Sequence, residues 1–451
     1  MRPKVWEKVR WLFVVSPAIV FFGCLTNDSD IIWNPPGGWG GDSAVTALFK
    51  EGRYDESFKE AEGAWSENGS DRILWQMEMI SNLLLNGEKD AAHKRMMLAR
   101  EDVELLFDER AESRAMRLWY KEGEKPFKGD GWERATLYAL LALSFIDRGD
   151  WTNAIRSAKK GLLCDSDSQN KEANGDYALL PYLGYIAAQR AGKDAESREF
   201  MTQYRSIVGA EIPQMAQTPD SLLVLWVGEG VTYRLDGEYA QRRKVVKGAI
   251  EGRLESVSVA ASDGRMWFSL PPGLADLNAQ AMGRGPRMMD RVLEDKVTTK
   301  ETLANVGNGL LAASAAMMVV GTADFRLAII LYPTAAATAL LAGGAMIGSS
   351  AVETTADARI WSCLPGRLLV VPVSGGEGQM QLTGYMGWDE VYKGDVGVPA
   401  RSPCKVSVCH KSLLPERLEI HANWKRQVLD SVDKLITDMQ LPENEKKMEI
   451  R

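Results

Sequence analysis

The residues of this chain best suited to chemistry are its five cysteines and three histidines. Cys404, Cys409 and His410 are close enough in sequence to suggest metal ligands, but zinc sites normally combine two short pairs, and a second pair is missing here. The segment from Cys404 to Cys409 resembles a strand, whose ends would lie roughly 16 Å apart, beyond disulfide reach. We therefore expect no metal and leave open a disulfide among Cys363, Cys404 and Cys409 in an oxidising compartment.

Established catalytic motifs are missing from the sequence. It contains no Gly-x-Ser-x-Gly elbow, no His-Glu-x-x-His and no Walker glycine loop. The segment Gly228-Glu229-Gly230 lacks a third glycine and a following helix, so it does not indicate a nucleotide site. Asp357 and Arg359 are better explained as structural residues that stabilise the start of a turn at Leu364-Pro365. His93 and His421 are expected to be solvated surface residues. The sequence therefore predicts no enzyme and no cofactor.

The amino-terminal segment predicts export. A basic start is followed by an apolar run from Trp11 to Phe22 and then by Gly23-Cys24, which indicates a signal peptide over residues 1–23. Phe21-Phe22-Gly23-Cys24 resembles a bacterial lipobox, in which the cysteine is acylated and the preceding peptide is removed. Because Leu25 rather than Asp follows, the resemblance implies a lipid-anchored, palmitate-bearing protein on the periplasmic face of the outer membrane. An ordinary cleaved signal or an uncleaved anchor is the alternative.

Length and composition fit a folded, exported protein. The 451 residues are 45% hydrophobic and 25% charged, enough for two or three domains with substantial cores. The net charge of −7 argues against a nucleic-acid partner, because phosphates require a basic face. Residues 24–42 are polar and rich in glycine and proline, as expected for a flexible tether.

Residues 43–215 contain a recurring pattern of paired amphipathic helices. Its clearest copy runs from Ala139 through Gly149-Asp150-Trp151 to Ala158, with a glycine at the turn and small residues on the second helix. This sequence pattern is typical of tetratricopeptide (TPR) repeats, and its several copies predict a short α-solenoid. A plain α-bundle is the alternative.

Three segments resemble a specific family. They are Glu124–Arg134, Ser221–Gly230 and the motif Ala356–Pro365. Their order and separation resemble bacterial TPR lipoproteins of unassigned function, over roughly residues 44–385. The sequence differs from the family pattern at Lys159-Lys160, where the family would have an arginine pair. It implies fold and location, but no activity.

The second half predicts strands on both sides of an unusual apolar segment. We expect β-rich segments over residues 216–300, which also hold a helix, and 353–410, joined in a small antiparallel sheet or sandwich. Between them lies the segment 301–352. After Glu301, its only charged residues are Asp324 and Arg326. We expect a helical hairpin here, buried on the sheet or between subunits because it is rich in small residues; membrane insertion and a ring of helices are the alternatives. Residues 411–451 are expected to form a helical and disordered tail.

Together these features favour an α+β protein that works as a lipid-anchored periplasmic scaffold. The repeats would bind other envelope proteins, and the lipid at Cys24 would bind the membrane; a homo-oligomer is also compatible. Two alternatives remain: a subunit of a ring around a motor or secretion channel, and an envelope enzyme with an unrecognised active site.

Overall fold

The computed structural model describes most of the chain between residues 44 and 410. The described residues are 44–66, 69–108, 126–166, 175–236, 238, 240–246, 255–283, 288–323, 325–351, 356–375, 378–386, 389–398 and 405–410. The expected signal peptide (1–23), the tether (24–42), Cys24, Cys404, His421 and the tail (411–451) lie outside them.

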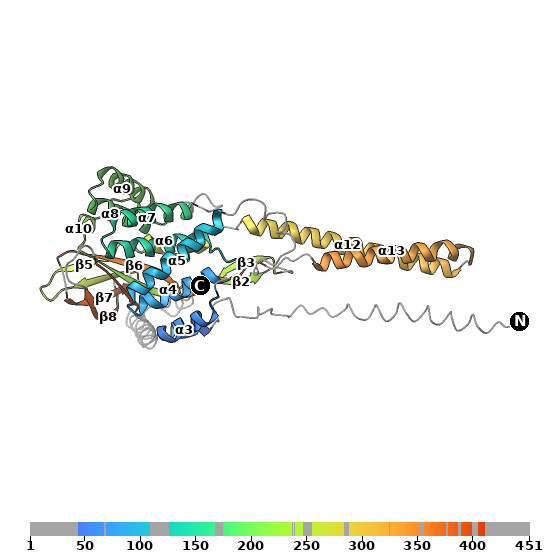
Figure 1. Ribbon diagram of the computed structural model, residues 1–451, viewed down its shortest axis with the longest axis horizontal. Coiled ribbons are helices and arrows are strands. Elements are labelled where there is room, and N and C mark those ends of the chain that lie inside the picture. Colours follow the sequence, from blue (N-terminus) through green and yellow to red (C-terminus); the bar gives the residue numbers. More distant parts are fainter. Residues whose placement is uncertain are drawn as a thin grey trace, which may run out of the picture. The chain divides into compact units, whose positions relative to one another are not determined.

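In the described residues before β1, helices form four successive pairs; most of these helices are labelled in Figure 1. Within each pair the two helices contact each other, and α7 also contacts α8. The pairs are α2 (Ala44–Lys50) with α3 (Tyr54–Ala64), α4 (Arg72–Leu85) with α5 (Lys89–Asp108), α6 (Gly131–Asp147) with α7 (Trp151–Asp165), and α8 (Leu179–Arg190) with α9 (Asp194–Val208). The short helix α10 (Gln214–Gln217) follows.

The same turn closes the first helix of every pair. At Gly149 the backbone has φ 72°, a left-handed conformation that favours glycine. The amide of Asp150 donates to the carbonyl of Phe145, and that of Gly149 donates to Ile146. This is the Schellman arrangement, which satisfies the last carbonyls of a helix. Equivalent bonds occur at Gly52, Gly87 and Gly192, so the glycine positions in the sequence mark the turns.

Strands from both sides of the apolar segment pair with each other. One sheet has the order β6-β1-β9 and another β5-β4-β7-β8, while β2 and β3 form a separate ribbon. The strands are β1 (Ser221–Glu229), β2 (Thr232–Asp236), β3 (Arg242–Val246), β4 (Ser256–Ala260), β5 (Met266–Phe268), β6 (Pro365–Val373), β7 (Gly378–Met386), β8 (Asp389–Val398) and β9 (Lys405–His410). A 3-10 turn, η4 (Pro272–Ala275), and helix α11 (Leu277–Gly283) follow β5.

Strand β1 is buried on both faces, which explains its continuous apolar sequence. Leu222, Val224 and Trp226 belong to the same core as the helices. The alternate residues Leu223 and Leu225 pack in a second core with side chains of the β4 and β7 sheet. The central sheet therefore lies between helices on one face and a second sheet on the other, and helical and β segments share one core.

The mixture of helices and sheets agrees with the α+β class expected from sequence. One strand departs from the antiparallel expectation, because β9 runs parallel to β1, with Leu222 opposite Val406. A parallel neighbour needs a long connection, and β9 is separated from β1 by most of the β segments. Sequence periodicity identifies a strand but does not specify the direction of its partner.

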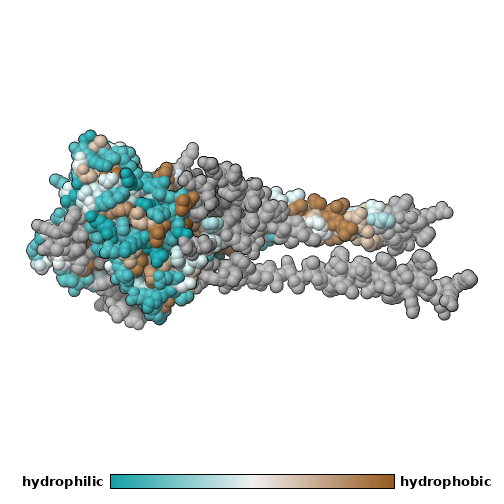
Figure 2. Space-filling model, viewed as in Figure 1, coloured by the Kyte–Doolittle hydropathy of each residue, from teal (hydrophilic) through white to brown (hydrophobic). Residues whose placement is uncertain are grey.

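The apolar segment forms two long helices, α12 (Met288–Ala323) and α13 (Phe325–Ala351). They pack on each other, and α12 also contacts β3. Burial on the sheet or between subunits was expected; within the single chain, large apolar side chains of both helices are exposed, among them Val319, Leu340 and Leu341. Figure 2 shows this hydrophobic surface on the two helices. Among the described residues, one helical stretch, Lys296–Val319, is long and apolar enough to cross a bilayer.

Candidate functional site

Polar side chains converge at a buried joint between helices and strands, and along a groove on the helical part. At the joint, the carboxylate of Glu78 on α4 is fully buried among apolar neighbours. Its Oε1 accepts from the amide and the hydroxyl of Ser362, each at 2.7 Å, and its Oε2 accepts from the amide of Cys363 at 2.9 Å. Glu78 thus holds the segment that leads into β6.

A second buried carboxylate, Glu133 on α6, acts on the same segment. Its Oε1 accepts from the amide of Trp361 at 2.7 Å, and its Oε2 accepts from the amide of Asp130 at 2.6 Å, closing a capping box at the start of α6. Asp130 also forms an ion pair with Arg243 of β3. Burial, and then the charge of Asp130, raise the pKa of Glu133 to about 8.

Arg359 completes the joint. Its guanidinium donates to both carboxylate oxygens of Asp357, at 2.9 and 2.8 Å, and to Asp71 before α4 at 2.5 Å, and it lies over the ring of Phe127. The side chain is only 4% exposed. The interpretation of Asp357 and Arg359 as bracing residues agrees with these contacts.

The contacts of Glu78 and Glu133 at this joint indicate that these two residues have a structural role. Each of the two buried glutamates accepts backbone amides with both of its oxygens, so the carboxylates are engaged in holding the chain. Burial, and then Glu78, raise the pKa of the Cys363 thiol well above its usual range, which makes it a poor nucleophile. The segments 124–134, 221–230 and 356–365 meet here: Glu133 accepts from the amide of Trp361, and Gly230 donates its amide to the carbonyl of Leu364.

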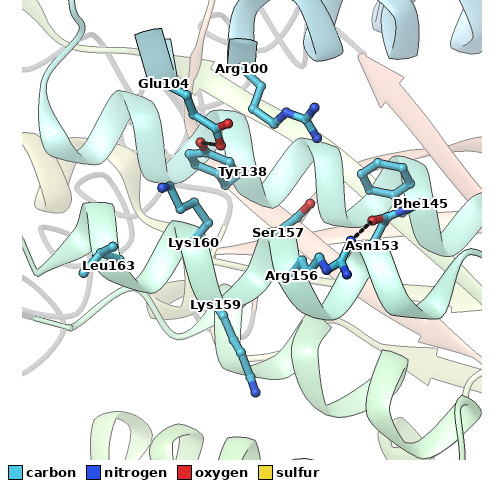
Figure 3. A pocket seen from close by; sticks show the side chains of 10 residues that line it. All are labelled: Arg100, Glu104, Tyr138, Phe145, Asn153, Arg156, Ser157, Lys159, Lys160 and Leu163. Atoms are coloured by element: carbon cyan, nitrogen blue, oxygen red, sulfur yellow. Dashed lines mark hydrogen bonds between the residues drawn. The ribbon is translucent and has the colours of Figure 1, made fainter. Parts of the chain in front are cut away.

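The groove lies between α5, α6 and α7, is open to solvent, and has a volume of about 540 Å³. Figure 3 shows the side chains around it. They come from α5, α6 and α7, and are Arg100, Glu104, Tyr138, Phe145, Asn153, Arg156, Ser157, Lys159, Lys160 and Leu163. The polar members lie beside exposed apolar surface at Leu163, which is 64% exposed. The combination is typical of a binding surface.

Positive charge dominates the groove. Four of its lining side chains are cationic, and one, Glu104, is a carboxylate. Glu104 accepts from the hydroxyl of Tyr138 at 2.9 Å, and Lys159 is paired with Glu196 of α9 at 3.1 Å. Arg156 donates to the side-chain oxygen of Asn153 at 3.3 Å. Because Asn153 is neutral, this contact does not compensate the positive charge of Arg156. The arrangement suits an acidic ligand.

Those cysteines and histidines that lie in the described part of the chain belong to several different elements. Cys363 is a free, buried thiol, and Cys164 on α7 is a free, half-buried one. Cys409 and His410 belong to β9. His93 differs from the solvated residue that was expected: it is half-buried, its Nδ1 is 2.9 Å from the hydroxyl of Ser144, and its ring packs edge-on against Phe145.

Sequence reasoning named Lys159 and Lys160 but missed the other groove cations. Arg156 lies three and four residues before these lysines on α7, so helical spacing could have identified one basic face. Arg100 lies on another helix pair, and no sequence signal links it to α7. Glu78 could have been noticed as a lone carboxylate between Met77 and Met79.

Comparison with known proteins provides no relative. No family model matches the chain, and neither a curated protein nor a solved structure matches it.

Proposed function

We propose that this protein is a lipid-anchored scaffold of the bacterial cell envelope, and that its helix pairs form a TPR-like solenoid that binds another protein. The observation that carries the proposal is the basic groove between α5, α6 and α7. Stacked helix pairs present such grooves to extended or helical segments of partners.

The chemistry of the groove specifies the partner segment. Arg100, Arg156 and Lys160 favour carboxylates, because arginine guanidinium groups form paired hydrogen bonds with them. Leu163 adds exposed apolar surface for a hydrophobic side chain of the same segment. The expected ligand is therefore an acidic protein segment with at least one apolar anchor.

The location rests on the amino-terminal sequence. Gly23-Cys24 supports acylation, and the tether over residues 24–42 would separate the folded part from the membrane surface. A partner held in the groove would then lie at the periplasmic face of the outer membrane.

Site-specific photo-crosslinking in intact cells tests the binding role. A photoreactive amino acid replaces Leu163 at the groove edge, and the matched control replaces Phe268, an exposed residue on β5. We expect a defined envelope protein to be captured at position 163 and not at 268. Capture should fall at least five-fold when Arg156→Glu and Lys160→Glu are combined in the same chain.

Two results would contradict the proposal. One is the absence of any adduct specific to position 163. The other is capture that stays unchanged after the double charge reversal, since the groove cations would then contribute nothing to binding.

A further inference from the structure

The contact between α12 and α13 is made by small residues, while several large apolar side chains of the two helices are exposed. Ala335 and Ala342 are fully buried, and a Cβ added at Gly307 would come within 2.7 Å of Met346 and 3.2 Å of the Ala342 carbonyl. By contrast, Leu340 is 78% exposed and Leu341 67%. Water-soluble proteins show the reverse arrangement, whereas small residues at the helix contact are typical of helices packed in lipid.

The charges of the hairpin are confined to its ends. The uncharged stretch Leu303–Ala323 spans roughly 30 Å as a helix, which matches the hydrocarbon thickness of a bilayer. Glu301 precedes this stretch, Asp324 follows it in the sequence, and Arg326 is the second residue of α13. Charge therefore occurs where the polar surfaces of a bilayer would be, and is missing in between.

Helix α13 has apolar residues around its whole circumference, and α12 packs on it from one side. It also carries Pro333 in its interior, which soluble helices rarely tolerate and membrane helices accept more often. A helix that is apolar all round needs a covering on every side.

We propose that the α12–α13 hairpin inserts into a lipid bilayer as a second membrane contact, separate from the lipid at Cys24. The bilayer covers Val319, Leu340 and Leu341, while the small-residue seam at Gly307 and Ala342 holds the two helices together. The inference does not depend on the groove, and it holds whether or not Cys24 is acylated.

A second copy of the chain is a weaker candidate for the covering. The exposed large apolar residues are on both helices: Val306, Met318 and Val319 on α12, and Leu340, Leu341 and Met346 on α13. A protein partner would be expected to leave a polar outer face on the hairpin, and α13 has none. A bilayer requires no such face.

Labelling from within the lipid tests the proposal on the full chain in native membranes. A carbene-generating probe that dissolves in the hydrocarbon core is activated, and labelled peptides are mapped by mass spectrometry. We expect peptides from residues 303–351 to carry at least ten-fold more label than those from α5. Leu340→Asp combined with Leu341→Asp should reduce this label several-fold, because charged residues are costly in the hydrocarbon core.

Leu105→Asp is the matched control, since Leu105 is a comparably exposed leucine on α5; it should leave the hairpin label unchanged. Because Leu340 and Leu341 make few contacts, the double variant should keep the wild-type circular dichroism spectrum. A parallel sample with Leu341→Cys is treated with a thiol crosslinker. An unlabelled hairpin would overturn the proposal; chain-to-chain crosslinks at position 341 would then assign the covering to another copy.

Discussion

Arg359 shows how single residues connect the helical and β parts. Its buried guanidinium joins Asp357, beside it in sequence, to Asp71 at the start of α4. Glu78 and Glu133 bind the backbone of the next residues from two different helices. Three ionisable side chains therefore position one short segment, and removing any of them would leave its hydrogen-bonding partners unpaired.

Arg359→Ala should destabilise the protein by about 3–5 kcal/mol, because Asp357 and Asp71 would lose their buried counter-charge. Arg53→Ala is the control: Arg53 also pairs with two carboxylates, Glu51 and Glu56, but it is 49% exposed. Exposed pairs contribute about 0–1 kcal/mol. Denaturant unfolding monitored by circular dichroism measures the unfolding free energy of both variants. Equal losses of stability in Arg359→Ala and Arg53→Ala would contradict a structural role specific to the joint.

Glu133 predicts a pH dependence of stability. Its pKa is raised from 4.5 in the unfolded chain to about 8 in the folded protein, so between these values the folded state holds the extra proton. Its contribution is therefore complete below pH 4.5 and is lost as the pH rises toward 8. In Glu133→Gln we expect the fall in unfolding free energy over this range to shrink by roughly 1–3 kcal/mol.

The measurement is denaturant unfolding at several pH values between 5 and 8. Glu60→Gln, at an exposed carboxylate of α3, serves as the control. A Glu133→Gln protein whose pH profile parallels that of the wild type would show that Glu133 is ionised throughout.

At the scale of elements, close helix contacts depend on glycines inside helices as well as at turns. Gly184 on α8 faces Phe200 on α9, and an added Cβ would lie 2.5 Å from the phenylalanine ring. The distance is too short for any real contact, so the ring or the helix would have to move. The close packing of α8 on α9 therefore depends on the absence of a Cβ atom at Gly184.

Gly184→Ala should cost about 1–3 kcal/mol of stability through overpacking against Phe200. Gly63→Ala in α3, where nothing lies within 4 Å of the added atom, should instead stabilise by about 0.5–1 kcal/mol. Thermal unfolding distinguishes the two directions. Adding Phe200→Leu to Gly184→Ala should recover part of the loss; a double variant no better than the sum of both single losses would rule out the direct contact.

At the scale of the whole molecule, strands before and after the hairpin complete the same sheets. β1 pairs with β6, and β4 pairs with β7. The chain therefore leaves a common core to form α12 and α13 and then returns to it. Two membrane contacts follow from the proposals, one lipid and one helical, at sites distant in sequence.

Cys24→Ala separates these contacts. If Cys24 is acylated, the substitution should abolish incorporation of labelled palmitate, since no other residue carries the lipobox. Membrane association should then persist and be lost on adding Leu340→Asp and Leu341→Asp. Palmitate incorporation is measured in cells and association by fractionation. Undiminished palmitate in Cys24→Ala would show that the lipobox interpretation is wrong.

The sequence alone determined the helix pairs, their glycine turns and the presence of strands, because periodicity and turn chemistry are local properties. Only the tertiary structure decided that β9 runs parallel to β1, and that Glu78, Glu133 and Arg359 converge on one segment. These are contacts between residues far apart in the chain, which no local pattern encodes. The apolar hairpin shows the same difference: its composition predicted two helices buried on the sheet or between subunits, and only the packing showed that Leu340 and Leu341 are exposed while Ala335 and Ala342 are buried.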